Sequence, residues 1–161
     1  MSSIKVHKAG LCTTIQDIGR IGYQQFGIPV SGAMDEFAFT VANYLVERDK
    51  KNAVLEIQFL GPSLEFDFDV TIAITGANIQ PKINHQDVKM WESIQVKKGD
   101  ILSFGSLKSG IRTYLAFSAE IDVPLVMGSK STLLKSNLGG LEGRAFKTGD
   151  IIPFKDVKVL S

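Results

Sequence analysis

Apolar and polar residues alternate at every second position through much of this chain, a period typical of β-strands that bury one face. The clearest case is residues 64–69, where Leu64, Phe66 and Phe68 alternate with acidic residues. Similar alternation, bounded by turn residues, covers residues 54–60, 70–74, 88–96, 101–104 and 111–117. We expect roughly eight to ten short strands, which favours a mainly β fold built as a closed or nearly closed β-barrel.

One stretch follows a helical period instead and predicts a single main helix over about residues 35–46. Its apolar stripe recurs at i, i+4 and i+8 and is widened by two alanines: Phe37, Val41 and Leu45, with Ala38 and Ala42. Asp35 can cap the first turn, where Glu36 also suits the helix dipole. Asp35 therefore has two interpretations, as an N-cap and as a site carboxylate at the exit of the preceding loop, and both can hold.

Two glycine-rich loops interrupt the strand pattern, at residues 13–34 and 124–144. The first interleaves apolar residues with polar ones, among them Gln16, Asp17, Arg20 and Tyr23. Functional side chains are often presented by loops that a rigid scaffold supports. We therefore predict that the segments around Arg20 and Lys130 converge at one end of the barrel and form half of a polar pocket that another polypeptide completes.

Composition narrows the class of protein. The chain has 161 residues, enough for one domain spanning residues 1–161, and its formal net charge is +1. It has no basic block that would favour nucleic acid, and no apolar run long enough to cross a membrane. One cysteine allows no internal disulfide, and the N-terminus lacks a signal-like apolar run. These features predict a cytoplasmic protein.

The sequence lacks the motifs of a P-loop, a dinucleotide-binding site and a metal site. In Gly128–Thr132 a serine precedes the lysine, so the P-loop pattern fails, although such a loop can still bind an anion through backbone N–H groups. The glycines at 139–143 do not match the dinucleotide fingerprint. His7 and His85 are isolated, so no metal site is expected.

Five polar residues outside the second loop have two interpretations each. Asp17 and Arg20 are three residues apart and could form a weak surface ion pair or a buried polar site. Arg112 and Tyr114 share one face of a strand whose other face is apolar, so they could line a site or face solvent. Glu56 lies on the polar face of its strand, where simple exposure is the alternative.

An ordered series of motifs resembles one family. The series is GLCTTIQDIGRIGYQQFGIPVSGAMD, Leu55-Glu56, Gly61-Pro62, ITGAN, RTYLAF, MGSKST and GGLEGR. It is similar to the allophanate hydrolase subunit 2 or KipA-like family, also called the 5-oxoprolinase C subunit, with a biotin-dependent carboxyltransferase-like domain. The resemblance covers nearly the whole chain and implies a cyclophilin-like β-barrel.

The resemblance also implies a partner of the KipI or allophanate hydrolase subunit 1 type, and three alternative functions. The first is a subunit of an ATP-dependent 5-oxoprolinase-like hydrolase, in which the complex binds ATP. The second is half of a carboxyltransferase that acts on a urea-like substrate, with biotin on a separate carrier. The third is a regulatory module that binds a KipI-like kinase inhibitor and catalyses nothing.

For the enzyme, the resemblance and the polar pattern together suggest a set of site residues. Asp17, Arg20 and Asp35 are the candidate catalytic residues. The candidate substrate-binding residues are Gln16, Tyr23, Glu56, Arg112, Tyr114, Ser129, Lys130, Ser131 and Thr132. Family chains are about twice as long, so a second chain could supply the C-terminal half. Two positions depart from the family pattern: Ser118-Ala119-Glu120 replaces a Gly-Gly pair, and Lys130 replaces an arginine, which loses bidentate recognition of an anion.

Overall fold

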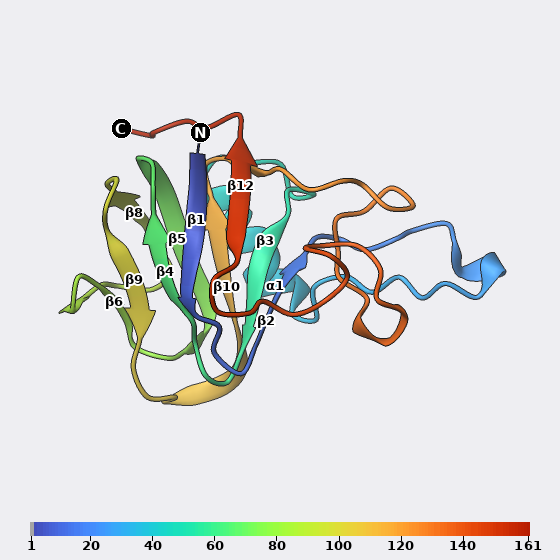
Figure 1. Ribbon diagram of the computed structural model, residues 1–161, viewed down its shortest axis with the longest axis horizontal. Coiled ribbons are helices and arrows are strands. Elements are labelled where there is room, and N and C mark those ends of the chain that lie inside the picture. Colours follow the sequence, from blue (N-terminus) through green and yellow to red (C-terminus); the bar gives the residue numbers. More distant parts are fainter. Residues whose placement is uncertain (1) are drawn as a thin grey trace.

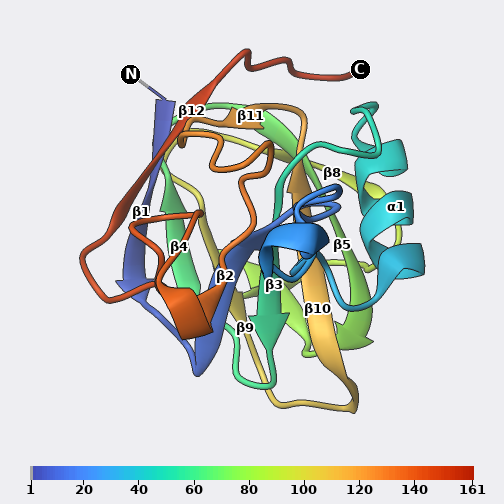
Figure 2. The same ribbon diagram turned by 90° about the vertical axis from the view of Figure 1, so that its right-hand side faces the viewer.

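A computed structural model describes residues 2–161 as two antiparallel β-sheets that pack face to face, with one α-helix on the outside of the smaller sheet (Figures 1 and 2). The larger sheet has the order β11 (Glu120–Ile121), β12 (Ile151–Lys155), β1 (Ser2–Lys8), β4 (Ser63–Phe66), β9 (Ile101–Phe104), β6 (Pro81–Ile83) and β7 (Gln86–Asp87). The smaller sheet has the order β2 (Cys12–Gln16), β3 (Val54–Gln58), β10 (Ser109–Phe117), β5 (Val70–Asn78) and β8 (Ser93–Val96).

The prediction of a mainly β fold is confirmed, and the two sheets with one helix are consistent with a cyclophilin-like fold, but a closed barrel, one form of the predicted closed or nearly closed barrel, is not found in residues 2–161. Within residues 2–161, strand pairing stays inside each sheet, and each sheet has two free edges, at β11 and β7 and at β2 and β8. Alternation along a strand shows which residues face the core, but it does not show which strand lies alongside. Closure depends on that second kind of information.

The main core lies between the two sheets and consists of the inward-facing residues of the alternating strands. Phe66 and Phe117 come from opposite sheets, with ring centroids 6.3 Å apart, and Phe117 meets Phe154 edge-on at 4.8 Å. Such aromatic pairs contribute about 0.5–1.5 kcal/mol beyond simple burial. This core makes the sandwich a rigid base for the loops that leave it.

Helix α1 (Glu36–Leu45) confirms the predicted helix, and Asp35 is its N-cap, since Asp35 Oδ1 accepts a hydrogen bond of 3.0 Å from the Ala38 N–H. The predicted stripe is confirmed at Ala38 and Ala42, which are buried, but Phe37 is 72% exposed. Val41 and Leu45 are only partly buried, and the other buried positions of the helix are Phe39 and Asn43. Ala73 and Ala116 on the sheet beneath are small, so the alanine side of the helix can approach closely.

A second buried cluster therefore lies between α1 and the sheet.

Among the residues that the structure describes, none of the helices has the length and apolar character needed to span a bilayer.

Both glycine-rich loops extend from the same end of the sandwich, at the right of Figure 1. The first, residues 17–35, reaches farthest and carries a short 3-10 turn, η1 (Gln24–Phe26). The second, residues 122–150, folds back beside it and carries η2 (Leu134–Ser136). Their common origin on the scaffold brings distant parts of the sequence together.

Candidate functional site

The two loops are joined through one carboxylate, that of Asp17 at the end of β2. Its Oδ1 accepts hydrogen bonds from Ser129 Oγ at 2.5 Å, Ser131 Oγ at 2.8 Å and the Gly19 N–H at 2.8 Å. Its Oδ2 accepts one from the Lys130 N–H at 2.8 Å. Four donors around a carboxylate that is 6% exposed make a closed anion site. The loop at Gly128–Thr132 thus binds an anion that belongs to its own chain.

Further bonds extend this junction along β2. Thr132 donates both its N–H and its hydroxyl to the Ile15 carbonyl, at 2.9 and 3.0 Å. Gln16 Nε2 donates to the Thr132 carbonyl at 3.1 Å. The prediction that the two loops converge at one end of the scaffold is therefore confirmed. Within this junction, the side chains of Asp17, Ser129 and Ser131 form hydrogen bonds with one another.

Lys130 points its ammonium group away from this carboxylate and toward β11. Its Nζ donates to Glu120 Oε1 at 2.8 Å and to the Ile121 carbonyl at 2.7 Å. The hydrogen bond from Lys130 is the main reason that the pKa of Glu120 is lowered. Lys130 thus contacts Glu120, which belongs to the other segment expected to depart from the family pattern, and this lysine has an internal counterion.

Arg20 is fully buried, at 0% exposure, and among the described residues its Nε, Nη1 and Nη2 have no hydrogen-bond partner. Burial lowers its pKa, and the charge of Asp17 opposes that shift. Gly139, with φ of 69°, packs directly against the guanidinium, and a Cβ there would overlap Arg20 Nη2 and the Ser131 carbonyl. Asp17 and Arg20 are therefore both buried near the loop junction without forming the ion pair considered from the sequence.

A second polar cluster lies on the face of the smaller sheet that α1 covers. Tyr114 on β10 pairs in register with Glu56 on β3, and the Tyr114 hydroxyl donates to Glu56 Oε2 at 2.7 Å. The same hydroxyl accepts from the Asp35 N–H at 2.9 Å, and Glu56 Oε2 also accepts from the Met34 N–H at 3.0 Å. Burial is the main cause that raises the pKa of Tyr114. This cluster fixes the start of the helix to the sheet.

Beside that cluster is a groove of about 670 Å³. Its lining residues come from the start of α1, the ends of β5 and β10, and the turn before β8: Met34, Asp35, Phe37, Gly76, Ala77, Trp91, Ser109, Gly110, Ile111 and Arg112. Arg112 Nε is 3.8 Å from Glu56 Oε1, which links the groove to the polar cluster. Strand alternation identified Arg112 and the helix-cap pattern identified Asp35, but Phe37 was expected on the buried stripe of the helix and Trp91 was given no role.

The structure thus separates the predicted site residues into two groups and leaves one apart. Asp35, Glu56, Arg112 and Tyr114 form the groove cluster. The loop junction contains Gln16, Asp17, Arg20, Ser129, Lys130, Ser131 and Thr132. Tyr23 belongs to neither, because it lies in the projecting tip, where its ring is 6.4 Å from that of Phe26.

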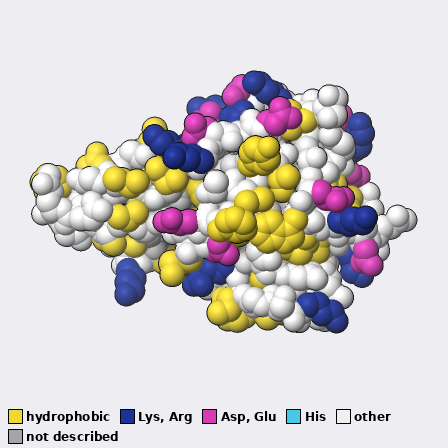
Figure 3. Space-filling view, turned by 180° about the vertical axis from the view of Figure 1, so that it is seen from behind, with side chains coloured by type: hydrophobic (Ala, Val, Ile, Leu, Met, Phe, Trp, Pro, Cys, Tyr) yellow, Lys and Arg dark blue, Asp and Glu magenta, His cyan; other side chains and the backbone are white. Residues whose placement is uncertain are grey.

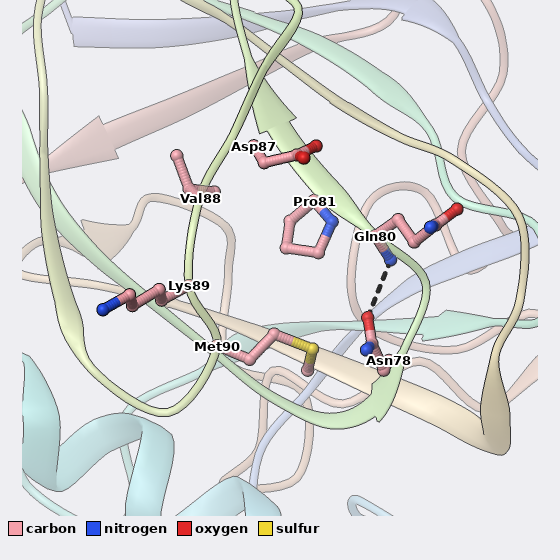
Figure 4. Close-up of a pocket in the computed structure, with 7 residues that line it drawn as sticks. All are labelled: Asn78, Gln80, Pro81, Asp87, Val88, Lys89 and Met90. Atoms are coloured by element: carbon pink, nitrogen blue, oxygen red, sulfur yellow. Dashed lines mark hydrogen bonds between the residues drawn. The ribbon is translucent and has the colours of Figure 1, made fainter.

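Another hollow, of about 430 Å³, lies beside β6 and β7 (Figure 4). Its charged side chains, Asp87 and Lys89, point in different directions, and the Gln80 N–H bonds to Asn78 Oδ1 within the chain. Across residues 2–161, no three His, Cys, Asp or Glu side chains are grouped as a metal site would require. The groove beside Arg112 is therefore the better candidate for a ligand.

Comparison with known proteins supplies a family. A family model described as carboxyltransferase domain, subdomain A and B, matches residues 26–160. The chain is 42% identical to the 5-oxoprolinase C subunit of Escherichia coli over 150 residues, which is 93% of this chain and 48% of that protein. It is 40% identical to urea amidolyase of Saccharomyces cerevisiae over 152 residues, which is 94% of this chain and 8% of that protein.

A solved structure agrees with these matches. The crystal structure of the Kluyveromyces lactis urea amidolyase superposes with a TM-score of 0.93 at 37% identity, over 98% of this chain and 10% of that chain. The chain thus spans about half the length of the bacterial protein and a small part of each amidolyase.

Proposed function

The chain belongs to the carboxyltransferase domain, subdomain A and B, family, and on that premise we propose that it is one component of a 5-oxoprolinase-like complex. Such a complex opens 5-oxo-L-proline to L-glutamate in an ATP-dependent reaction. The observation that carries this proposal is the 42% identity to a 5-oxoprolinase subunit over 93% of this chain. The second bacterial relative, from Haemophilus influenzae, bears the same name at 34% identity.

In this role, the chain's own residues bind and orient the substrate. Hydrolysis of the lactam adds water across its C–N bond, and activation of that amide by ATP makes the step accessible. The N–H and hydroxyl donors of Gly128–Thr132 do not fit a nucleotide phosphate, because Lys130 N–H, Ser129 Oγ and Ser131 Oγ already hold Asp17. We therefore assign ATP binding to another component of the complex.

The partners are a KipI-like protein and, where it is a separate chain, a second half equivalent to the remaining length of the bacterial relative. The name of that relative describes a subunit, and this chain covers 48% of it. The projecting loops offer a contact face, since Ile21, Phe26, Leu125 and Met127 are exposed. Figure 3 shows hydrophobic side chains gathered over this projection. A partner that covers these side chains would bury them away from water.

The second candidate function is half of a carboxyltransferase that acts on a urea-like substrate. Two observations favour it, the family description and the 40% identity to a urea amidolyase. Biotin would arrive on a separate carrier, because the sequence has no Met-Lys-Met segment. The aromatic walls and the Asp35 carboxylate of the groove suit a ureido ring, so the chain's part would again be to bind and orient.

The test is reconstitution. We expect the chain, co-expressed with a KipI-like protein and the other subunits, to show ATP hydrolysis that depends on 5-oxo-L-proline and yields L-glutamate. The same mixture without this chain is the control. Absence of that activity, together with capture of a biotin carrier and urea-dependent carboxyl transfer, would overturn the proposal in favour of the second function.

A further inference from the structure

We propose that the groove beside Arg112 binds a small cyclic amide that carries a single carboxylate, with the carboxylate on Arg112, the ring N–H on Asp35 and the ring lying against Phe37 and Trp91. The choice of 5-oxo-L-proline as the natural example rests on the proposed function. The chemical class rests on the walls, floor and charges of the groove itself.

The floor of the groove is built by an irregularity in β10. Ser109 pairs with Asn78 and Thr113 with Gly76, so residues 110–112 lie opposite Ala77 alone. Bulges of this kind redirect side chains and are common beside active sites. A Cβ on Gly76 would lie 2.5 Å from the Arg112 carbonyl oxygen, and one on Gly110 would lie 2.8 Å from Ala77 Cβ. The two glycines therefore permit the bulge and leave space above it.

The walls are two aromatic rings that the fold leaves uncovered. Phe37 is 72% exposed and Trp91 is 43% exposed, with ring centroids 6.2 Å apart and planes tilted by 39°. Trp91 has φ of 63°, a conformation costly for a bulky residue, and its N–H bonds to the Ile74 carbonyl at 2.7 Å. A strained, exposed tryptophan beside a groove is poorly explained by folding alone. A flat ring lying against these residues would bury both.

The polar groups select the charge of the ligand. Arg112 is 29% exposed in its side chain, and its Nε has no hydrogen-bond partner among residues 2–161. Glu56 does not satisfy it, because Oε1 is 3.8 Å away and Oε2 is engaged by Tyr114 and Met34. A carboxylate on the guanidinium is the natural counterion. A phosphate dianion would face both Glu56 and Asp35, so the groove favours a monoanion.

Asp35 supplies the complementary acceptor. Its Oδ1 accepts from the Ala38 N–H at the helix cap, and its second carboxylate oxygen has no partner in the described part of the chain. An amide N–H of the ligand can donate to that oxygen. A lactam acid carries both required groups on one small ring.

The experiment uses the fact that Trp91 is the only tryptophan of the chain. Its fluorescence is followed while 5-oxo-L-proline is added to the purified chain, alone and with its partner subunits. We expect a saturable change, and binding weaker by about tenfold or more for 2-pyrrolidone, which lacks the carboxylate, and for cyclopentanecarboxylate, which lacks the N–H. Absence of a saturable response in both preparations overturns the inference.

Variants test whether the fluorescence change comes from binding in the groove. Arg112→Gln should weaken binding by about tenfold or more, and Arg112→Lys by less, because lysine keeps the charge without the fork of donors. Phe37→Ala changes an exposed residue and leaves folding intact, and it should weaken binding several-fold. Arg48→Gln, which removes a cation just beyond the opposite end of α1, should bind as the unaltered chain does. Equal affinity in all four variants, or a response to biotin with none to 5-oxo-L-proline, overturns the inference.

The outcomes also separate the two proposals. Saturable binding in the groove by a complex without ATP turnover supports the inference and overturns the proposed function. Turnover with an unchanged KM for Arg112→Gln supports the proposed function and overturns the inference.

Discussion

The Asp17 carboxylate with its donors and the groove beside Arg112 are both polar, and they differ in whether their polar groups already have hydrogen-bond partners. Arg20, which is buried beside Asp17, is the exception at the junction, because its three side-chain nitrogens have no partner among residues 2–161. At the junction, each hydrogen bond of the Asp17 carboxylate ends on the chain itself, and Lys130 is held by Glu120. In the groove, Arg112 Nε has no partner within residues 2–161, and two aromatic rings stand exposed. We interpret the junction as architecture that ties the loops together, and the groove as the binding surface.

This comparison indicates that a sequence segment dense in glycine, serine and aspartate can hold two loops together instead of binding a ligand. The glycines, serines and Asp17 of the two loops are the most conspicuous pattern in the sequence, and most of their donors and acceptors satisfy one another. The groove, in contrast, depends on a strand bulge and two separated aromatic residues. Stability and binding should therefore respond to different substitutions.

The largest effect is expected for Asp17→Asn. The amide would lose the charge and present N–H groups to donors that now point at a carboxylate oxygen, so the free energy of unfolding should fall by about 3 kcal/mol or more. Denaturant unfolding measures this. The control is Asp67→Asn, which removes an exposed carboxylate 3.6 Å from Lys98 and should change stability by under about 0.5 kcal/mol. Equal losses of stability in the two variants would contradict a structural role for the Asp17 carboxylate.

Gly139→Ala should come next, with a loss of about 2–3 kcal/mol, because the added methyl overlaps Arg20 Nη2 in a backbone conformation that favours glycine. Gly99→Ala separates the two causes. Gly99 also has positive φ, 94°, but an added Cβ meets nothing within 4 Å, so only the backbone cost of about 1 kcal/mol remains. Thermal unfolding of both variants compares them. If the two lose the same stability, tight packing around Arg20 is not important.

Tyr114→Phe removes the hydroxyl that links Glu56 to the Asp35 N–H and should cost about 1–2 kcal/mol. Because burial raises the pKa of Tyr114 above its ordinary value of 10.0, folding favours the neutral phenol. Its contribution to stability is therefore complete below that ordinary value and is lost as pH rises beyond it. Unfolding measured from pH 8 to 11 should show a shallower alkaline decline for Tyr114→Phe than for the unaltered chain. Tyr44→Phe, which removes a hydroxyl at an exposed position, is the matched control.

The smallest effect on stability is expected for Arg112→Gln. Its Nε makes no hydrogen bond in the described chain and lies 3.8 Å from the buried Glu56 carboxylate, so the free energy of unfolding should fall by about 1 kcal/mol or less, well below the loss expected for Asp17→Asn. Denaturant unfolding beside Asp17→Asn provides the comparison. A loss as large as that of Asp17→Asn would mean that the groove, too, is structural.

Local patterns in the sequence were enough for most strands and for the helix. The alternation at 88–96 forms a strand only at Ser93–Val96, and residues 2–161 contain twelve strands where eight to ten were expected. Alternation around Phe66 depends only on which face is buried, and Asp35 caps the helix through residues next to it. The expectation of a closed barrel failed because sheet closure depends on partners distant in sequence. The buried face of α1 was partly misplaced because Ala73 and Ala116, on strands far along the chain, decide which side of the helix can approach.

The residues near the site could be predicted from the sequence, but the directions in which their side chains point could not. Arg20 and Lys130 were expected to face one pocket, yet Arg20 packs under Gly139 and Lys130 turns to Glu120, a direction that sequence spacing does not contain. Phe37 was missed because α1 packs on the sheet through its alanine side. Trp91 was missed because its exposure accompanies a left-handed backbone conformation that the sequence does not reveal.

The most direct test of the contrast between the loop junction and the groove is the KM of the reconstituted complex for 5-oxo-L-proline. It is measured for the Arg112→Gln variant and, as a control, for the Arg48→Gln variant. We predict a KM raised by about tenfold or more for Arg112→Gln alone, with both variants still folded. An unchanged KM for Arg112→Gln in an active complex would contradict this prediction.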